Sequence, residues 1–192
     1  MELDKLLAEL EEFGSRNDSS QTERSHKMLN ITKDTGEFLT VFIKAAKSRS
    51  ILEIGTSNGY STIWLAVGAG YTGGRITTVD FSEVKAEMAK TNFEKADLTA
   101  LIEQVIDDAG NFLKNAQSDA YDFIFLDSQR SAYTSWLPDI KRILRRGGSL
   151  VADNALSHKG EMDAFMSAVN KDSDFTTCLL TVGNGQYIAV LE

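Results

Sequence analysis

Residues 51–61 read Ile51-Leu-Glu-Ile-Gly-Thr-Ser-Asn-Gly-Tyr-Ser61, a short apolar run followed by a glycine-containing turn and the start of a helical segment. The run predicts a buried strand, and Gly55 and Gly59 stand where the backbone must turn sharply from strand to helix. Glycine at such a turn also lets a ligand approach, because no Cβ is in the way. We interpret the stretch as the first strand, turn and helix of an α/β domain with a ligand site at the turn. A tight turn that binds nothing is the alternative.

Asp80 ends the next predicted strand and supports a ligand site. It follows the turn by about 20 residues, where an acidic side chain can accept hydrogen bonds from ribose hydroxyls. The glycine spacing is G-x-x-x-G, and Ser57 takes the place of the second glycine in the dinucleotide fingerprint G-x-G-x-x-G, so a pyrophosphate is less well served. These features predict a pocket for a cofactor with a free ribose, and they count against a nicotinamide dehydrogenase.

Strand-like and helix-like segments alternate along the rest of the chain. Such alternation predicts a parallel sheet covered on both faces, because each parallel return needs a crossover. We expect strands near residues 50–54, 75–80, 101–106, 121–127 and 148–153, and helices near residues 59–69, 82–96, 108–116, 132–145 and 160–171. Gly183-Asn184-Gly185 lies between two further strand-like segments and predicts a hairpin, so the last two strands should pair antiparallel.

The N-terminal region has a different pattern. Leucines at helical spacing predict an amphipathic helix over residues 2–13, which Phe13-Gly14 should end. The polar residues 15–25 read as a mobile loop. Asp34 should then cap a second helix, with Glu37 in the capping-box position.

Length and composition bound the class of protein. The 192 residues, 42% of them apolar, fit one domain over residues 1–192 that buries about 70% of the surface of its unfolded chain. The net charge of −8, with 20 scattered Lys and Arg residues, argues against nucleic acid as the main partner. Cys178 has no cysteine partner, no apolar run approaches a membrane span of roughly 20 residues, and the acidic start of the chain is wrong for a secretion signal. We expect a soluble cytoplasmic protein, with no membrane partner and with a homodimer left open.

Three oxygen-bearing side chains follow two neighbouring predicted strands. Asp127 ends the run Tyr121-Asp-Phe-Ile-Phe-Leu126, and Asp153-Asn154 follows the Gly147-Gly148 turn and a short apolar strand. Parallel strands present their carboxyl ends at the edge where open α/β sheets bind ligands, so the three can surround one divalent cation. Oxygen ligands favour Mg²⁺ over Zn²⁺, with Ca²⁺ or Mn²⁺ as alternatives. A purely structural role, or contact of Asp127 with a cofactor, is the other interpretation.

Taken together, these motifs resemble those of the catechol O-methyltransferase-like class I methyltransferases. The resemblance runs from about residue 28 to the C-terminus, and it rests on the segments 53–61, 78–80, 108–109, 123–127 and 147–154. It implies a doubly wound, mostly parallel, seven-stranded Rossmann-like sheet with an antiparallel C-terminal strand. It also implies an O-methyltransferase that uses S-adenosylmethionine.

The resemblance assigns roles to individual residues. S-adenosylmethionine would lie across the turn formed by Gly55, Thr56, Ser57, Gly59 and Ser61. Its ribose would meet Asp80, its adenine would lie beside Phe81, Asp108 and Ala109, and Glu53 and Ser61 would help to hold its methionine end, with Asp127 on the sulfonium side. The family lays the segment equivalent to Met28–Ile31 over the cofactor, so residues 1–33 would cover the cofactor and acceptor site.

One position departs from the family pattern. The family usually has a lysine, suited to act as a general base, three residues after its first metal aspartate, whereas this chain has Arg130. Arginine stays protonated at physiological pH and cannot take a proton. Arg130 then either stabilises the acceptor anion or pairs with a surface carboxylate. His158 is an alternative base, because an unperturbed histidine titrates near pH 6.5.

The leading hypothesis is a divalent-metal-dependent O-methyltransferase that acts on a small aromatic, catechol-like acceptor. A bound metal can lower the pKa of the acceptor hydroxyl and orient it toward the sulfonium methyl. Trp64, Tyr133 and Trp136 are candidate aromatic walls for the acceptor, although aromatic residues at helical positions more often belong to a core. An RNA base hydroxyl as the acceptor, and a cofactor-binding protein with altered catalysis, are the alternatives.

Overall fold

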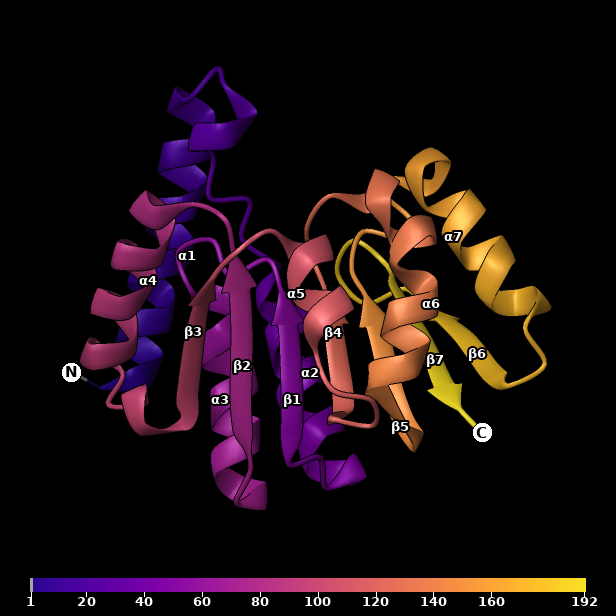
Figure 1. Cartoon of the computed structure of the whole chain (residues 1–192). Helices are drawn as coiled ribbons and strands as arrows, with labels where there is room; N and C mark the ends of the chain where they lie inside the picture. Colours follow the sequence, from indigo (N-terminus) through magenta and orange to yellow (C-terminus); the bar gives the residue numbers. More distant parts are fainter. Residues whose placement is uncertain (1) are drawn as a thin grey trace.

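The computed structural model describes residues 2–192 as one seven-stranded sheet flanked by helices (Figure 1). The strands are β1 (Ser50–Ile54), β2 (Arg75–Asp80), β3 (Ile102–Ile106), β4 (Tyr121–Leu126), β5 (Leu144–Ala152), β6 (Phe175–Leu180) and β7 (Gln186–Leu191). The helices are α1 (Leu3–Ser20), α2 (Lys33–Ala46), α3 (Tyr60–Thr72), α4 (Glu83–Lys95), α5 (Ala109–Asn115), α6 (Tyr133–Ile143) and α7 (Lys159–Lys171), with 3₁₀ turns η1 (Arg24–His26), η2 (Thr99–Leu101) and η3 (Arg130–Ala132).

The strand order is β3-β2-β1-β4-β5-β7-β6. The pairs among β1 to β5 are parallel, whereas β7 pairs antiparallel with both β5 and β6. This confirms the doubly wound, mostly parallel sheet and the antiparallel C-terminal hairpin. Gly183 and Gly185 both have positive φ in the hairpin loop, and the Gly185 N–H donates to the Val182 carbonyl at 2.9 Å, as the glycine-rich sequence predicts.

Two hydrophobic layers cover the sheet, which explains why its central strands are apolar on both faces. Ile51, Phe123 and Phe125 face one layer, built with α1, α2, α3 and α4. Leu52, Ile124 and Leu126 face the other, built with α5, α6 and α7. Figure 1 shows α2 and α3 behind the sheet and α5 and α6 in front of it, with the parallel strands pointing to the edge where the N-terminal segment projects.

The N-terminal helix is longer than the sequence predicts. α1 continues through Gly14 to Ser20, and a 3₁₀ turn occupies residues 24–26, so much of the expected loop is helical. Gly14 does not end the helix, because it is a packing position: a Cβ there would lie 2.5 Å from the Asn30 side-chain nitrogen. An i,i+4 pair between Arg16 and Glu12 at 2.9 Å supports the added turn.

Two further local predictions are wrong. α2 begins at Lys33 with Thr32 as its N-cap, and Asp34 does not cap it; the Asp34 carboxylate accepts a 3.0 Å hydrogen bond from the Gly183 N–H of the C-terminal hairpin. The Gly147-Gly148 pair is not a turn before β5 but lies within it. Gly147 has φ of +75°, and the register between β4 and β5 shifts beside it, so the glycines form an irregularity inside a longer strand.

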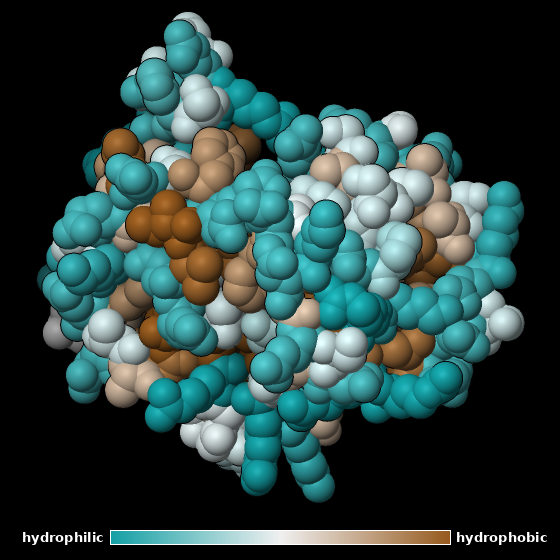
Figure 2. Space-filling view, in the orientation of Figure 1, coloured by the Kyte–Doolittle hydropathy of each residue, from teal (hydrophilic) through white to brown (hydrophobic). Residues whose placement is uncertain are grey.

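The surface in Figure 2 is mostly hydrophilic, with a notch at its upper edge beside the projecting N-terminal segment. Within residues 2–192, no helix has both the length and the apolar character needed to cross a membrane.

Candidate active site

A cavity of about 1060 Å³ lies at the carboxyl ends of the parallel strands. Its floor is the turn after β1 together with the residues that follow β2, β4 and β5, and residues 28–31 with η1 form part of its wall. This is the edge where open α/β sheets bind ligands. Seven of the predicted cofactor residues line it: Gly55, Thr56, Ser57, Ser61, Asp80, Phe81 and Asp127.

The glycines of the β1 turn are required by the fold itself. Gly55 has φ of +108° and Gly59 has φ of +84°, a region that disfavours side chains. A Cβ at Gly55 would collide with the Asp127 carbonyl oxygen, and one at Gly59 would lie 2.5 Å from the Phe93 ring. Gly59 therefore packs against α4, and it is not among the described residues that line the cavity; its contact with a cofactor stays a prediction.

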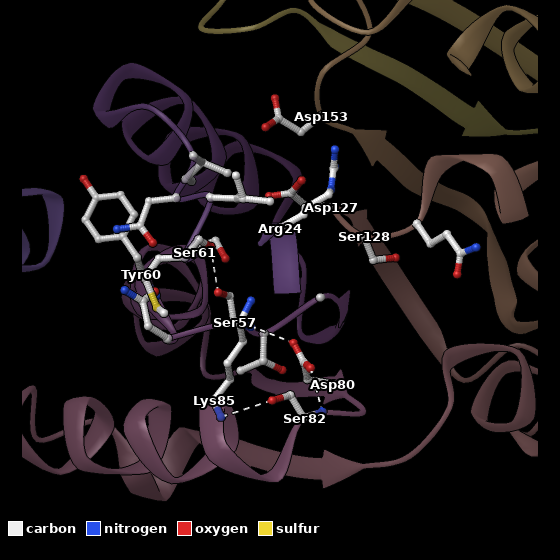
Figure 3. Close-up of a pocket in the computed structure, with 18 of the residues that line it drawn as sticks. Arg24, Ser57, Tyr60, Ser61, Asp80, Ser82, Lys85, Asp127, Ser128 and Asp153 are labelled. Carbon is white, nitrogen blue, oxygen red and sulfur yellow. Dashed lines mark hydrogen bonds between the residues drawn. The ribbon is translucent and has the colours of Figure 1, made fainter. Parts of the chain in front are cut away.

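Asp80 is held by the backbone around it. Its Oδ2 accepts a 2.8 Å hydrogen bond from the Ser57 N–H, and its Oδ1 accepts a 2.9 Å bond from the Ser82 N–H, the first of which is drawn in Figure 3. Each oxygen can accept a further hydrogen bond, and the side chain lines the cavity. The carboxylate is therefore fixed in place and available to hydroxyl donors.

Glu53 lies behind the cavity wall rather than in it. Its fully buried carboxyl accepts hydrogen bonds from the hydroxyls of Ser61 at 2.5 Å and Thr78 at 2.6 Å, and from that of Thr62. Burial raises the pKa of Glu53 to about 7, although the three hydroxyl donors oppose the shift. Glu53 is not among the described residues that line the cavity, whereas Ser61, which donates to it, is; the help that Glu53 would give in holding the methionine end stays a prediction.

The residues predicted to lie beside the adenine are near the edge of the cavity. Phe81 is 80% exposed and borders both the cavity and an adjacent pocket of about 60 Å³, which Ala109 also lines. Asp108 caps α5 by accepting a 2.9 Å hydrogen bond from the Asn111 N–H, and its neighbour Asp107 lines the smaller pocket. The contact of these residues with an adenine stays a prediction.

The three predicted metal ligands come together. The Asn154 amide nitrogen donates to Asp127 Oδ1 at 3.2 Å and to Asp153 Oδ2 at 3.0 Å, and Gln186 donates to Asp153 Oδ1. Figure 3 shows the two carboxylates on the same side of the cavity. Within residues 2–192 no three His, Cys, Asp or Glu side chains form a metal-ligating group, so the predicted set depends on the Asn154 amide.

The two carboxyls are in an environment that disfavours their negative charge. Burial raises the pKa of Asp127 well above its usual range, and the nearby charges of Asp153 and Glu53 raise it further. Burial also raises the pKa of Asp153, while the hydrogen bond from Gln186 opposes that shift. Two desolvated carboxyls side by side, with an amide whose oxygen and nitrogen can exchange places by rotation, fit a divalent cation.

Arg130 and His158 both reach the cavity. Arg130 is only 4% exposed, and its Nε donates to Glu161 at 3.1 Å, so the predicted pairing with a carboxylate is present. The positive charge of Arg130 also lowers the pKa of Asp127 and of Asp153, and all three residues line the same cavity. His158 is the N-cap residue of α7, and its Nδ1 lies 2.9 Å from the Ser157 hydroxyl.

The candidate aromatic walls are not part of the cavity lining formed by the described residues. Tyr133 is fully buried and its hydroxyl accepts a 2.6 Å hydrogen bond from the Ser128 N–H, while Trp136 packs on Tyr133 and Trp64 packs edge-on against Tyr60. Tyr133 is a core residue, and Trp64 and Trp136 are partly buried and pack against the core. The wall instead includes polar residues that sequence reasoning missed, among them Asp18, Arg24, Lys85, Gln129, Glu161 and Asn184.

Known proteins resemble this chain over most of its length. The sequence profile described as O-methyltransferase matches residues 1–190. A catechol O-methyltransferase of Mycobacterium tuberculosis is 33% identical over 130 residues, and one of Niastella koreensis is 30% identical over 141 residues. These alignments cover 68% and 72% of this chain, but 59% and 63% of the relatives.

Solved structures show the same fold. The O-methyltransferase from Bacillus cereus, in complex with SAH, is 23% identical, has a TM-score of 0.79, and matches 98% of this chain and 91% of its own. With the fold, the strand-end cavity and a profile match over nearly all residues in agreement, the chain belongs to the O-methyltransferase family.

Proposed function

We propose that the protein transfers the methyl group of S-adenosylmethionine to a hydroxyl of a small aromatic, catechol-like acceptor, with a divalent cation at the site. The observation that carries the proposal is the position of the Asp127, Asp153 and Asn154 group in the same cavity as the Gly55–Ser61 turn and Asp80. The names of the two catechol O-methyltransferase relatives support the acceptor class.

Asp80 would accept hydrogen bonds from the ribose hydroxyls of the cofactor, because its two oxygens are fixed by backbone donors and face the cavity. The Ser61 hydroxyl donates to Glu53 and so is held in one orientation at the cavity wall, where it would meet the methionine end. Phe81 and Ala109 would border the adenine. In the reaction the acceptor oxygen forms a bond to the methyl carbon, the carbon–sulfur bond breaks to leave a thioether, and the hydroxyl proton is released.

Asp127, Asp153 and the Asn154 amide oxygen would hold the cation, with Mg²⁺ preferred and Ca²⁺ or Mn²⁺ as alternatives. When bound, a divalent cation lowers the pKa of a coordinated hydroxyl. Arg130 supplies positive charge next to the two carboxyls, where it would stabilise the acceptor oxyanion. His158 lines the same cavity and is the alternative proton acceptor.

Several broader expectations also stay proposals. We retain a single domain over residues 1–192 in which residues 1–33 cover the site, a cytoplasmic location, and a homodimer as one assembly to examine. A nucleic-acid acceptor is disfavoured by the net charge of −8. A cofactor-binding protein with altered catalysis is a second candidate. Arg130 stands where the family usually has lysine, and its guanidinium pairs with Glu161.

The test is methyl transfer to 3,4-dihydroxybenzyl alcohol with radiolabelled S-adenosylmethionine, with Mg²⁺ present and with excess EDTA. We expect transfer with Mg²⁺, its loss with EDTA, and recovery when Mg²⁺ is restored. Asp153→Asn should weaken Mg²⁺ binding in calorimetry, whereas Asp163→Asn, an exposed change on α7, should not. Full transfer in excess EDTA would show that the carboxyl pair has a structural role. Cofactor binding without transfer to any hydroxylated aromatic compound would favour the second candidate.

A further inference from the structure

Most charged side chains on the cavity wall have partners within the protein. Both oxygens of the Asp18 carboxylate are used, by the N–H groups of Met28 at 2.7 Å and Leu29 at 2.9 Å. The Lys85 ammonium donates to the Lys27 carbonyl at 2.7 Å, and Arg130 pairs with Glu161 at 3.1 Å. Each of these groups is held in place by a partner within the protein, and these contacts help to hold the wall together.

Arg24 differs from them. It belongs to η1, lines the cavity, and makes neither a side-chain hydrogen bond nor an ion pair with any part of residues 2–192. Arg24 and Asp127 line the same cavity, as Figure 3 shows, and the positive charge of Arg24 lowers the pKa of that carboxyl. The cavity that would hold the acceptor hydroxyl therefore has a guanidinium on its wall with no hydrogen-bond or ion-pair partner within residues 2–192.

Two other basic groups close to Arg24 along the chain or on the cavity wall have acidic partners. His26, the other basic residue of η1, lies 3.9 Å from Glu23. Arg130, the other arginine that lines the cavity within residues 2–192, pairs with Glu161 at 3.1 Å. Arg24 is therefore the guanidinium on the described cavity wall that is free to bind an anionic group of a ligand.

We propose that Arg24 determines acceptor specificity by binding a carboxylate on the acceptor ring, so that the preferred substrates are hydroxylated aromatic acids. The planar guanidinium fork matches a carboxylate with two parallel hydrogen bonds, which a lysine ammonium cannot provide. This inference rests on the proposed methyl transfer for its reaction, but the recognition step requires only that the acceptor binds.

The test compares two acceptors of similar size, 3,4-dihydroxybenzoate and 3,4-dihydroxybenzyl alcohol, in the wild type and in Arg24→Gln, Arg24→Lys and Arg16→Gln. Arg16→Gln is the matched control, since Arg16 is an exposed arginine of the same N-terminal region that pairs with Glu12 and does not line the cavity. Binding is measured by calorimetry with S-adenosylhomocysteine and Mg²⁺ present, and kcat/KM is measured separately with S-adenosylmethionine.

We expect the wild type to prefer the acid. Arg24→Gln should weaken binding of the acid about tenfold, the size of one charge-assisted hydrogen bond near the low end of its range, and should change the alcohol less than about twofold. Arg24→Lys should recover part of the loss, and Arg16→Gln should change neither ligand. Equal binding of the two ligands to the wild type, an equal loss of both in Arg24→Gln, or binding of neither would overturn the inference. Selective binding of the acid without methyl transfer would refute the proposed reaction and keep the role of Arg24.

Discussion

The Ser57 hydroxyl donates a 2.7 Å hydrogen bond to the backbone carbonyl of Met28, and so joins the glycine turn after β1 to residues 28–31 of the cavity wall. The same residue presents its N–H to Asp80. Ser57 occupies the position at which a dinucleotide-binding turn has its second glycine. In this chain the serine side chain at that position would hinder a pyrophosphate, and its hydroxyl holds residue 28 against the turn.

Ser57→Ala should loosen the contact between the glycine turn and residues 28–31 without unfolding the protein. The lost hydrogen bond is worth about 0.5–1.5 kcal/mol, so we expect S-adenosylmethionine affinity to fall by a few-fold. Amide hydrogen exchange at Met28 and Leu29 should speed up in the same variant. Ser19→Ala, which removes a 2.8 Å bond within α1, is the control and should leave both measurements unchanged. Unchanged exchange at residues 28–29 in Ser57→Ala would contradict the role of this contact.

Asp80→Asn should weaken S-adenosylmethionine binding by about 1.5–3 kcal/mol, because a charged acceptor of hydrogen bonds becomes a neutral one. Asparagine keeps one acceptor oxygen, so one of the two backbone N–H groups of Ser57 and Ser82 also loses its partner. Calorimetry at constant ionic strength measures the change, with Asp163→Asn as the surface control. Tighter binding of NAD than of S-adenosylmethionine to the wild type would refute the assignment of the pocket.

Glu53 should make the protein less stable as the pH rises. Because burial raises the pKa of Glu53 from 4.5 to about 7, the folded state keeps a proton that the unfolded state has lost, and the free energy of unfolding falls between these values. The difference of about 2.5 pH units, at about 1.4 kcal/mol each, amounts to roughly 3 kcal/mol. Urea unfolding at pH 5 and pH 8 should show this fall.

Glu53→Gln should flatten that pH dependence, and Glu87→Gln, at an exposed position of α4, should leave it as in the wild type. Part of the slope should persist, because burial raises the pKa of Asp127 in the same direction. An identical slope in the wild type and in Glu53→Gln would show that Glu53 is ionised in the folded protein at neutral pH.

Arg130→Lys should retain or raise methyl transfer, and Arg130→Met should lose only a modest electrostatic contribution. Arginine cannot act as the base, and Glu161 is 49% exposed, so it stays solvated when its partner is removed. His158→Ala should have little effect on the acid limb of the pH–rate profile. A loss of several orders of magnitude in His158→Ala, with Mg²⁺ still bound, would identify that histidine as the base.

The sequence predicted the parts of the site that depend on strand ends. Asp80 ends β2, and Asp127 and Asp153 directly follow β4 and β5, and in a parallel sheet this alone brings them to one edge. The sequence could not predict contacts between loops that are far apart in the chain. Nothing in the pattern around Arg24 distinguishes a cavity residue from a solvated one, and Gly14 suggested a helix end because its packing against Asn30 is invisible in sequence.

The same limit explains Glu53 and Asp34. Sequence motifs suggest a cofactor-side role for Glu53 and a helix-cap role for Asp34. In the folded protein the contacts of both residues are set by partners that are distant in the sequence. Glu53 faces three hydroxyls in the interior, and Asp34 accepts a hydrogen bond from Gly183, which is 149 positions away in the chain.

The hydrogen bond from Gln186 to Asp153 has a consequence for the order in which the protein becomes functional. Gln186 is the first residue of β7, so one carboxyl of the candidate metal site is held by a strand that is synthesised after all the parallel strands. The glycine turn and Asp80 are synthesised more than a hundred residues earlier. The cofactor end of the site can therefore form before the carboxyl pair is complete, and the capacity to hold a cation would be acquired only when the β6–β7 hairpin docks beside β5.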